Sequence, residues 1–105
     1  RSVIWTPQAW KGLQQTARRI RSEYGLSARV KFMQNMLDTA ALLQKHPHLG
    51  PVEPLLAHRT RLYRSIVATP LNKLIYYVGD DTIEIAAVWD TRRDPAALAA
   101  EVKSR

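Results

Sequence analysis

The sequence contains no cysteine, and this absence excludes disulfide bonds, thiolate nucleophiles and zinc–thiolate centres. Uninterrupted apolar runs reach only four or five residues, whereas a membrane-spanning helix needs about 20. The first ten residues, RSVIWTPQAW, contain no apolar segment of the kind that a signal peptide requires. Together these absences favour a cytoplasmic protein that does not enter a membrane.

Acidic residues are scarce, because nine Asp and Glu stand against sixteen Lys and Arg and leave a net charge of +7. Such an excess favours an anionic partner, which can be nucleic acid, an acidic protein or a membrane surface. A basic protein without any such partner is the alternative. The hydrophobic fraction of 46% is too high for a disordered chain, and 105 residues fit one domain, residues 1–105, with a modest core.

The common catalytic motifs are also missing. The sequence has no phosphate-binding or dinucleotide-binding glycine motif and no Ser-His-Asp order. His46, His48 and His58 lie in or near one loop, but no Asp or Cys joins them at a metal-binding spacing. Glu53 and the Asp80-Asp81 pair lack the spacing of paired catalytic carboxylates. We therefore expect no metal and no cofactor, and we expect the histidines to be surface loop residues.

The first half of the chain has helical periodicity. Residues 2–5 (SVIW) are β-prone, and Thr6-Pro7 is typical of a helix start with Thr6 as the N-cap. Gly25 is expected to end this helix, and Ser27 to cap a second helix that ends near Lys45, which predicts an antiparallel helical hairpin. The expected apolar stripes are Trp10, Leu13, Ala17, Ile20 and Tyr24 on the first helix, opposite Lys11, Arg18, Arg19 and Arg21, and Val30, Met33, Leu37, Ala40 and Leu43 on the second.

The second half is β-prone, with runs at residues 62–68, 74–78 and 83–89 after a break at HPHLGP. VGDDT predicts a tight hairpin loop in which Gly79 and Asp80 tolerate positive φ. Asp94-Pro95 repeats the cap-then-proline pattern and opens a final helix that runs to about Lys103. The order β-α-α-β-β-β-α predicts an α+β fold in which a helical hairpin packs on a small, mainly antiparallel sheet.

Cations surround the predicted sheet and its connections. They are Arg59, Arg61, Arg64, Lys73, Arg92 and Arg93. Lys73 begins one strand and Arg93 ends the next, so pairing about VGDDT brings both to one rim, with Arg64 on the neighbouring strand. Such a cluster can hold phosphate groups. Ordinary solvated charge, with Arg92 or Arg93 paired to Asp90 or Asp94, is an equally weighted alternative.

The aromatic residues are expected mainly in the core. Trp10, Tyr24, Tyr76 and Tyr77 are predicted to be buried or half-buried. Trp89 is also predicted to pack in the core, although its place beside the cations leaves stacking on a base, or anchoring of a partner helix, as an alternative.

The ordered set of motifs resembles the RelE/ParE superfamily of toxins from type II toxin–antitoxin modules. The similarity covers nearly the whole chain and includes LLQKHPHLGP, followed by RLYRSIVATPLNKLIYYVGDDTIEIAAVWDTRRDP. It implies a bacterial cytosolic toxin that forms a complex with a cognate acidic, partly disordered antitoxin. It also implies two possible activities on one scaffold, and the fold alone does not choose between them.

RelE-like members cleave mRNA on the ribosome without a metal. The resemblance assigns their basic positions to Arg64, Lys73 and Arg93, with His58 as a possible acid–base group. The chain departs from that set at Ile66, where a second basic residue is expected, and at Ala99, where a tyrosine is expected. Where some members have a histidine near the end of the last strand, this chain has Trp89-Asp90. Losing an acid–base group commonly costs about 10²–10⁴-fold in rate.

ParE-like members poison DNA gyrase and lack the nuclease set. The resemblance therefore favours a non-enzymatic, ParE-like toxin over the mRNA endonuclease, and a non-toxic basic nucleic-acid-binding relative is a further alternative. The residues expected to contact the target or an anion are Arg59, Arg61, Trp89, Arg92 and Arg93.

Overall fold

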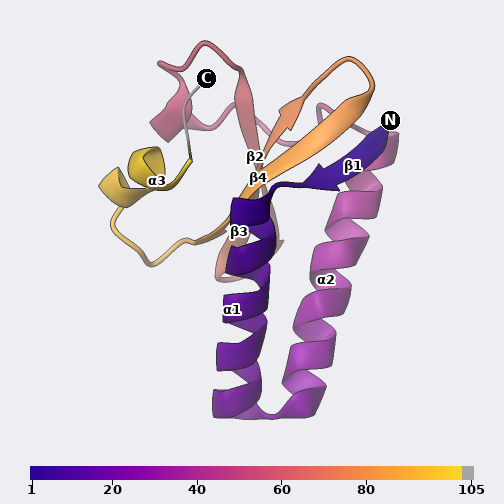
Figure 1. Cartoon of the computed structure of the whole chain (residues 1–105), viewed down its shortest axis with the longest axis vertical. Helices are drawn as coiled ribbons and strands as arrows, with labels where there is room; N and C mark the ends of the chain where they lie inside the picture. The colour runs from indigo at the N-terminus through magenta and orange to yellow at the C-terminus, as the bar shows by residue number, and fades with distance from the viewer. Residues whose placement is uncertain (103–105) are drawn as a thin grey trace.

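The computed structural model describes residues 1–102, which form a four-stranded sheet with two long helices on one face (Figure 1). The elements are β1 (Ser2–Trp5), α1 (Pro7–Tyr24), α2 (Leu26–Lys45), the 3₁₀ turn η1 (Pro54–Leu56), β2 (Tyr63–Thr69), β3 (Asn72–Val78), β4 (Thr82–Asp90) and α3 (Ala96–Glu101). This order confirms the predicted α+β fold. No helix in the described part of the chain is both long and apolar enough to cross a membrane.

The sheet has the strand order β1-β4-β3-β2. The three later strands pair antiparallel, whereas β1 pairs parallel with the first half of β4, from Ser2 opposite Thr82 to Trp5 opposite Ile85. The helical hairpin thus connects β1 at one edge of the sheet to β2 at the other edge. Because β1 stops at Trp5, the second half of β4 has no strand beside it on that edge within residues 1–102, and α1 lies there instead.

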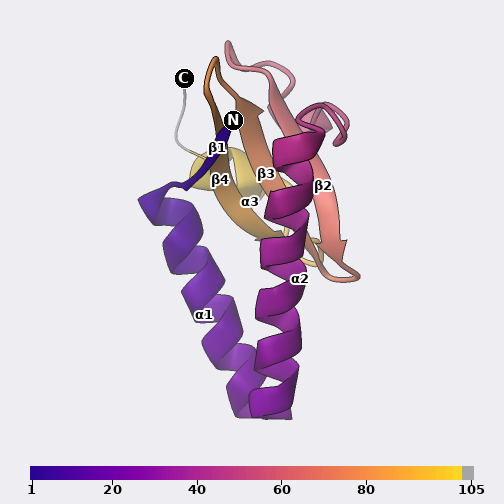
Figure 2. The same ribbon diagram turned by 90° about the vertical axis from the view of Figure 1, so that its right-hand side faces the viewer.

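Two apolar clusters lie on the two faces of the sheet. The larger one fills the space under α1 and α2 and includes Leu13, Met36 and Tyr76. The smaller one lies on the opposite face, where η1 and α3 cover Ile75 and Trp89. Figure 2 shows the sheet between the helical hairpin and α3. A chain of this size gains most of its stability from such buried apolar area.

The local signals at the start of the hairpin act as predicted. The Thr6 hydroxyl accepts a hydrogen bond from the Ala9 amide at 3.1 Å, and Pro7 occupies the first helical turn. Gly25 adopts a φ of 96° and ends α1. The prediction for Ser27 was wrong, because α2 already begins at Leu26 with Gly25 in the capping position and no side-chain cap.

The predicted apolar stripes are only partly correct. On α2 the buried residues are Phe32, Met36, Ala40 and Leu43, while Val30 and Leu37 of the predicted stripe are exposed. Apolar residues lie on several sides of α2, so periodicity alone did not identify the side that faces the sheet. On α1, Trp10 and Tyr24 are exposed rather than buried. The hairpin extends past the end of the sheet, so the turns of α1 and α2 nearest to Gly25 have no strand to pack against (Figures 1 and 2).

The later turns differ from the prediction in detail. The hairpin loop predicted at VGDDT joins β3 to β4, but of the described residues only Gly25 has a positive φ, so Gly79 and Asp80 do not use the conformation that they could tolerate. The hairpin closes instead through a hydrogen bond from the Gly79 amide to the Thr82 carbonyl at 2.8 Å. Before α3, the Asp94 carboxylate accepts a bond from the Ala96 amide at 3.1 Å. The N-cap of α3 is Pro95, one residue after the predicted cap, and it makes no side-chain cap bond. The predicted end of this helix, Lys103, lies outside the described residues.

The loop after α2 is anchored by Tyr76. Its hydroxyl donates to the Pro47 carbonyl and accepts from the Gly50 amide, both at 2.9 Å. Tyr76 is fully buried, as predicted, and Tyr77 is half-buried. From this anchor the chain crosses the outer edge of β2, where Val52 bridges to Arg64. The loop therefore reaches both faces of the sheet.

Candidate functional site

The strand register confirms only part of the predicted basic cluster. Lys73 lies opposite Trp89 of β4, so it is close to the end of that strand. Lys73 projects from the face that carries Ile75, whereas Arg64 projects from the face that carries Ile66, under the helices. Lys73 and Arg64 therefore lie on neighbouring strands but on opposite faces of the sheet. They do not form one phosphate clamp.

Lys73 is paired with a carboxylate inside the protein. Its ammonium group is ion-paired with Glu53, whose side chain is only 1% exposed, while that of Lys73 is 20% exposed. Burial on its own raises the pKa of the Glu53 carboxyl, but hydrogen bonds from Lys73, the Leu55 amide and Ser65, with the charge of Lys73, bring it below its ordinary value. Glu53 is thus ionised at neutral pH and neutralises Lys73. The sequence showed one hint of this, a single carboxylate between prolines and apolar residues in PVEPLL.

Arg64 is also committed to the fold. Its guanidinium donates to the Gly50 carbonyl at 2.9 Å and so holds the loop that Tyr76 anchors. His58, the possible acid–base residue, is exposed in the turn after η1. No hydrogen bond of its side chain is present in residues 1–102. Ala99 lies on α3 and packs against the smaller apolar cluster.

Arg59 and Arg61 contact the fold on the α3 side. Arg59 donates to the carbonyls of Ala99 and Val102 at 2.6 and 2.9 Å, which are unpaired groups at the C-terminal end of α3. Arg61 lies 4.5 Å from the centre of the Tyr77 ring and forms an ion pair of 2.8 Å with Glu84. Both arginines therefore stabilise the packing of η1 and α3 on the sheet.

Arg92 and Arg93 remain partly accessible at the end of β4. Arg92 contacts Asp90 through two side-chain bonds of 3.1 and 2.9 Å. Arg93 forms an ion pair of 2.8 Å with Glu101 and lies 4.4 Å from the centre of the Trp89 ring. Trp89 is 2% exposed, which confirms its predicted place in the core. A partner must displace Arg93 to stack on this ring.

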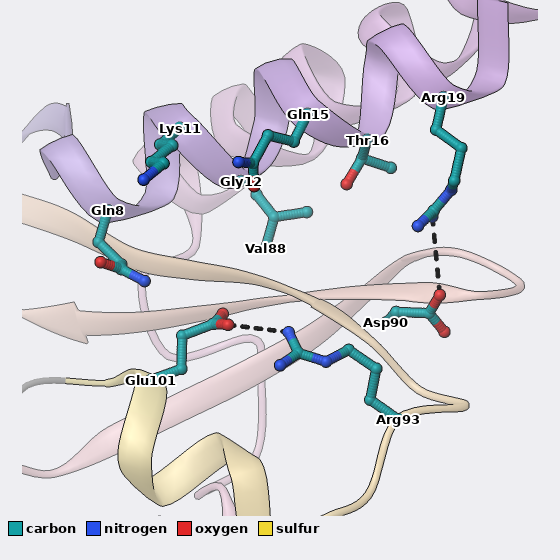
Figure 3. A pocket seen from close by; sticks show the side chains of 10 residues that line it. All are labelled: Gln8, Lys11, Gly12, Gln15, Thr16, Arg19, Val88, Asp90, Arg93 and Glu101. Atoms are coloured by element: carbon teal, nitrogen blue, oxygen red, sulfur yellow. Dashed lines mark hydrogen bonds and ion pairs between the residues drawn. The ribbon is translucent and has the colours of Figure 1, made fainter. Parts of the chain in front are cut away.

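A polar cleft opens beside Arg93 (Figure 3). It lies between α1, the half of β4 that does not pair with β1, and α3. Its volume is about 310 Å³. Its lining is formed by Gln8, Lys11, Gly12, Gln15, Thr16, Arg19, Val88, Asp90, Arg93 and Glu101. The sequence placed Lys11 and Arg19 on the outer side of α1 but gave no sign that this side borders a cleft, because the cleft depends on the pairing of β1 with β4.

The lining of the cleft carries more positive than negative side chains. Arg19 lies 3.7 Å from Asp90, and its side chain is half exposed. The Arg92 hydrogen bonds, opposed by burial, and the charges of Arg92 and Arg19 hold the pKa of Asp90 below its ordinary value. Lys11 has no carboxylate within ion-pair distance in residues 1–102. The arrangement can therefore attract an anion electrostatically, and it presents no histidine for proton transfer.

Comparison with known families gives a match between residues 3–95 and the model of the ParE toxin of the type II toxin–antitoxin system parDE. The chain belongs to the ParE toxin family. A solved structure, a chromosomal ParDE TA system from P. aeruginosa, matches with a TM-score of 0.70 at 18% identity. The alignment covers 85% of this chain and 94% of the other, and it shows a shared fold. No curated protein matches the sequence.

The family match supports a type II toxin, and in the structure the rim cations Lys73, Arg92 and Arg93 are each paired with a carboxylate of the fold. The match of this ParE-family toxin extends from β1 through the turn that carries Arg92 and Arg93. Within residues 1–102, no group of three or more His, Cys, Asp or Glu side chains is arranged to hold a metal ion. The chemistry that the site offers is recognition of negative charge.

Proposed function

We propose that this ParE-family toxin acts in the cytoplasm by inhibiting DNA gyrase and that a cognate acidic antitoxin neutralises it. The observation that carries the choice of target is the pairing of Lys73 with the buried Glu53. A nuclease needs a cation that is free to stabilise the charge developing on a phosphate. Here that position is neutralised from within the fold, which favours a binding toxin over an mRNA endonuclease.

Two further features argue against the nuclease. Arg64 faces the helices and donates to Gly50, on the opposite side of the sheet from Lys73. The positions where nuclease relatives carry a second basic residue and a tyrosine hold Ile66 and Ala99. A set of cations on two faces of the sheet, one of them neutralised by a buried carboxylate, is poorly suited to cleave RNA.

Charge and exposed apolar surface both suit an acidic antitoxin. The net charge of +7 favours rapid association with an acidic chain. On α2, Leu26, Val30 and Leu37 form a row of exposed apolar side chains along one side of the helix. An acidic amphipathic segment that folds on binding would bury this row.

Induced expression in bacteria tests the proposed target. We expect growth arrest together with covalent gyrase–DNA complexes and an induced DNA-damage response, while mRNA remains intact. In purified form, the toxin should cause gyrase to accumulate cleaved plasmid. Translation-dependent cleavage of transcripts, without gyrase–DNA complexes, would establish the endonuclease instead. The double variant E53Q/K73Q serves as the internal control, because it removes both charges of the buried pair together. In protein that circular dichroism shows to be folded, it should abolish toxicity only if Lys73 is a nuclease residue.

The antitoxin is tested separately. A small acidic protein encoded beside the toxin gene should restore growth when it is co-expressed, and it should co-purify with the toxin. Replacing Val30 and Leu37 by Asp should prevent this rescue by placing charge in the apolar row. If the wild-type toxin causes no growth arrest at all, the chain is a non-toxic relative and the proposal fails.

A further inference from the structure

One exposed side of α1 carries only positively charged and polar neutral side chains. Six exposed residues form this side, which we term the α1 basic face: Gln8, Lys11, Gln15, Arg18, Arg19 and Ser22. At 100° per residue they span about a quarter of the helix circumference, opposite the buried Leu13 and Ala17. No acidic and no apolar side chain interrupts this strip.

The α1 basic face differs from the sheet rim in the state of its cations. At the rim, Lys73, Arg92 and Arg93 each have a carboxylate partner within the fold. On α1, Lys11 and Arg18 have no carboxylate within ion-pair distance in residues 1–102, and Arg19 has only the 3.7 Å contact to Asp90. The positive charge of the α1 basic face is therefore more available to a partner than that of the rim.

The polar cleft continues the α1 basic face inward. Lys11, Gln15 and Arg19 belong both to the face and to the wall of the cleft, and Figure 3 shows their side chains along the same side of α1. Across the cleft, Arg93 adds a third cation, and the two carboxylates of the lining, Asp90 and Glu101, lie beside Arg19 and Arg93. The face and the cleft thus form one continuous polar surface with an excess of cations.

The composition of this surface fits a phosphate backbone better than a folded protein. Protein interfaces need a buried apolar or aromatic centre, and the α1 basic face has none. Phosphate contacts are made mainly by Lys and Arg, supplemented by Gln, Ser and Thr. Lys11 and Arg19 are separated by about 12 Å along the helix axis, a length over which duplex DNA presents several phosphates.

We propose that the toxin itself contacts the sugar–phosphate backbone of duplex DNA through the α1 basic face, without reading base sequence. This inference rests on the proposed function, because a toxin that binds gyrase on DNA lies beside a duplex. The helical hairpin extends beyond the sheet, so α1 can lie along a duplex without a clash from the strands (Figure 1).

Salt-dependent binding of a fluorescent 20-base-pair duplex to the purified toxin tests the inference, with no gyrase present. Three phosphate contacts, from Lys11, Arg18 and Arg19, predict a slope of log K against log salt of about −2.7. Between 50 and 200 mM salt the affinity should then fall about 40-fold. The double variant K11Q/R18Q should reduce the slope to about −0.9 and the loss to about 3- to 4-fold.

The matched control is K31Q/K45Q, which removes the same amount of charge from exposed positions on α2. Its slope should stay within about 0.5 of the wild-type value. Equal weakening by both double variants would show diffuse attraction and overturn the inference, as would absence of binding at 50 mM salt. Circular dichroism confirms that both variants fold.

Three further outcomes separate this inference from its alternatives. If K11Q/R18Q retains DNA affinity but loses binding to a poly-glutamate peptide, α1 recognises an acidic protein and the inference is wrong. If wild-type toxin traps gyrase on DNA while K11Q/R18Q keeps the full salt slope, the inference fails and the proposed function stands. If the wild type binds DNA with the expected slope but never traps gyrase, the proposed function fails and the DNA contact stands.

Discussion

Lys73 and Glu53 form an ion pair across the edge of the sheet, between β3 and the loop that precedes η1. The carboxylate is buried and also accepts a bond from the Leu55 amide at 3.0 Å, so it is fixed on more than one side. A buried pair of this kind contributes little net stability, but losing one partner strands the other charge. The pair therefore fixes the loop and removes Lys73 from the set of free cations.

Replacing Glu53 by Gln should destabilise the fold at neutral pH by about 2–3 kcal/mol, because the ammonium group of Lys73 is left half-buried without its anion. The pKa of Glu53 is lowered in the folded state, so the stabilisation is present above the unfolded pKa of about 4.3 and is lost as the pH falls through the folded value. Urea unfolding at pH 7 and at several values below 4.5 measures this. An acid slope that is the same in wild type and E53Q would rule out the assignment.

Tyr76→Phe tests the anchor of the loop after α2. The change removes the partner of the Gly50 amide and of the Pro47 carbonyl, so we expect a loss of about 1–3 kcal/mol. Burial raises the pKa of the Tyr76 hydroxyl, although the Gly50 bond and the charge of Arg64 oppose this. The stability gained from the neutral hydroxyl is thus present below about pH 10 and declines as the pH rises through the folded pKa.

The matched control for Tyr76 is Tyr63→Phe, a second buried tyrosine in the sheet whose hydroxyl makes no hydrogen bond in residues 1–102. Its effect should stay below about 0.5 kcal/mol. Denaturant curves from pH 7 to 10.5 for the three proteins should show the alkaline loss in wild type and Y63F and a smaller one in Y76F. Equal losses for both variants would mean that the loop is not anchored by this hydroxyl.

Replacing Gly50 or Gly12 by alanine should change the stability of the fold in opposite directions. At Gly50 a β-carbon would lie 2.9 Å from the Ser65 carbonyl carbon and from the Tyr76 hydroxyl, and closer still to the Ser65 carbonyl oxygen. Gly50→Ala should therefore cost more than about 3 kcal/mol. At Gly12 the nearest atoms, both of Val88, are 3.8 and 3.9 Å away. Gly12→Ala should stabilise α1 by about 0.5–1 kcal/mol. Thermal unfolding measures both, and a stabilising G50A would contradict the close packing of this loop on β2.

Residues that act through their immediate neighbours were predictable from the sequence. Thr6-Pro7, Gly25 and Asp94 each begin or end a helix through bonds within a few positions, so local patterns identified them. Ser27 failed because Gly25 serves both helices, which leaves no separate capping turn before Leu26. The error at Val30 arose from choosing between two apolar sides of α2, which only the docking against the sheet decides.

The candidate site depends on contacts between distant segments, and there the sequence was less informative. The sequence showed that side chains alternate between the two faces along each strand. It did not show that Arg64 and Lys73 project from opposite faces, because that depends on the register between β2 and β3. Glu53 reaches Lys73 because its loop crosses the edge of β2. The cleft beside α1 exists because β1 pairs in parallel with β4 and then stops short. None of these relationships has a signature within a few residues.

The remaining rim cations can be tested for a role at the target. Arg92 and Arg93 are the most exposed of the predicted site cations, with side-chain exposures of 61% and 47%. The double charge reversal R92E/R93E should abolish growth arrest and the trapping of gyrase on DNA. Both positions lie at the surface, so the melting temperature should change little, although Arg93 also packs on Trp89.

A second double variant, R93Q/E101Q, removes the Arg93–Glu101 ion pair at constant net charge and measures how much this pair contributes to stability. Growth assays, gyrase–DNA adducts and circular dichroism are scored together, with K31E/K45E as the charge-matched control. A folded R92E/R93E protein with undiminished toxicity would show that the end of β4 is not the surface that meets the target.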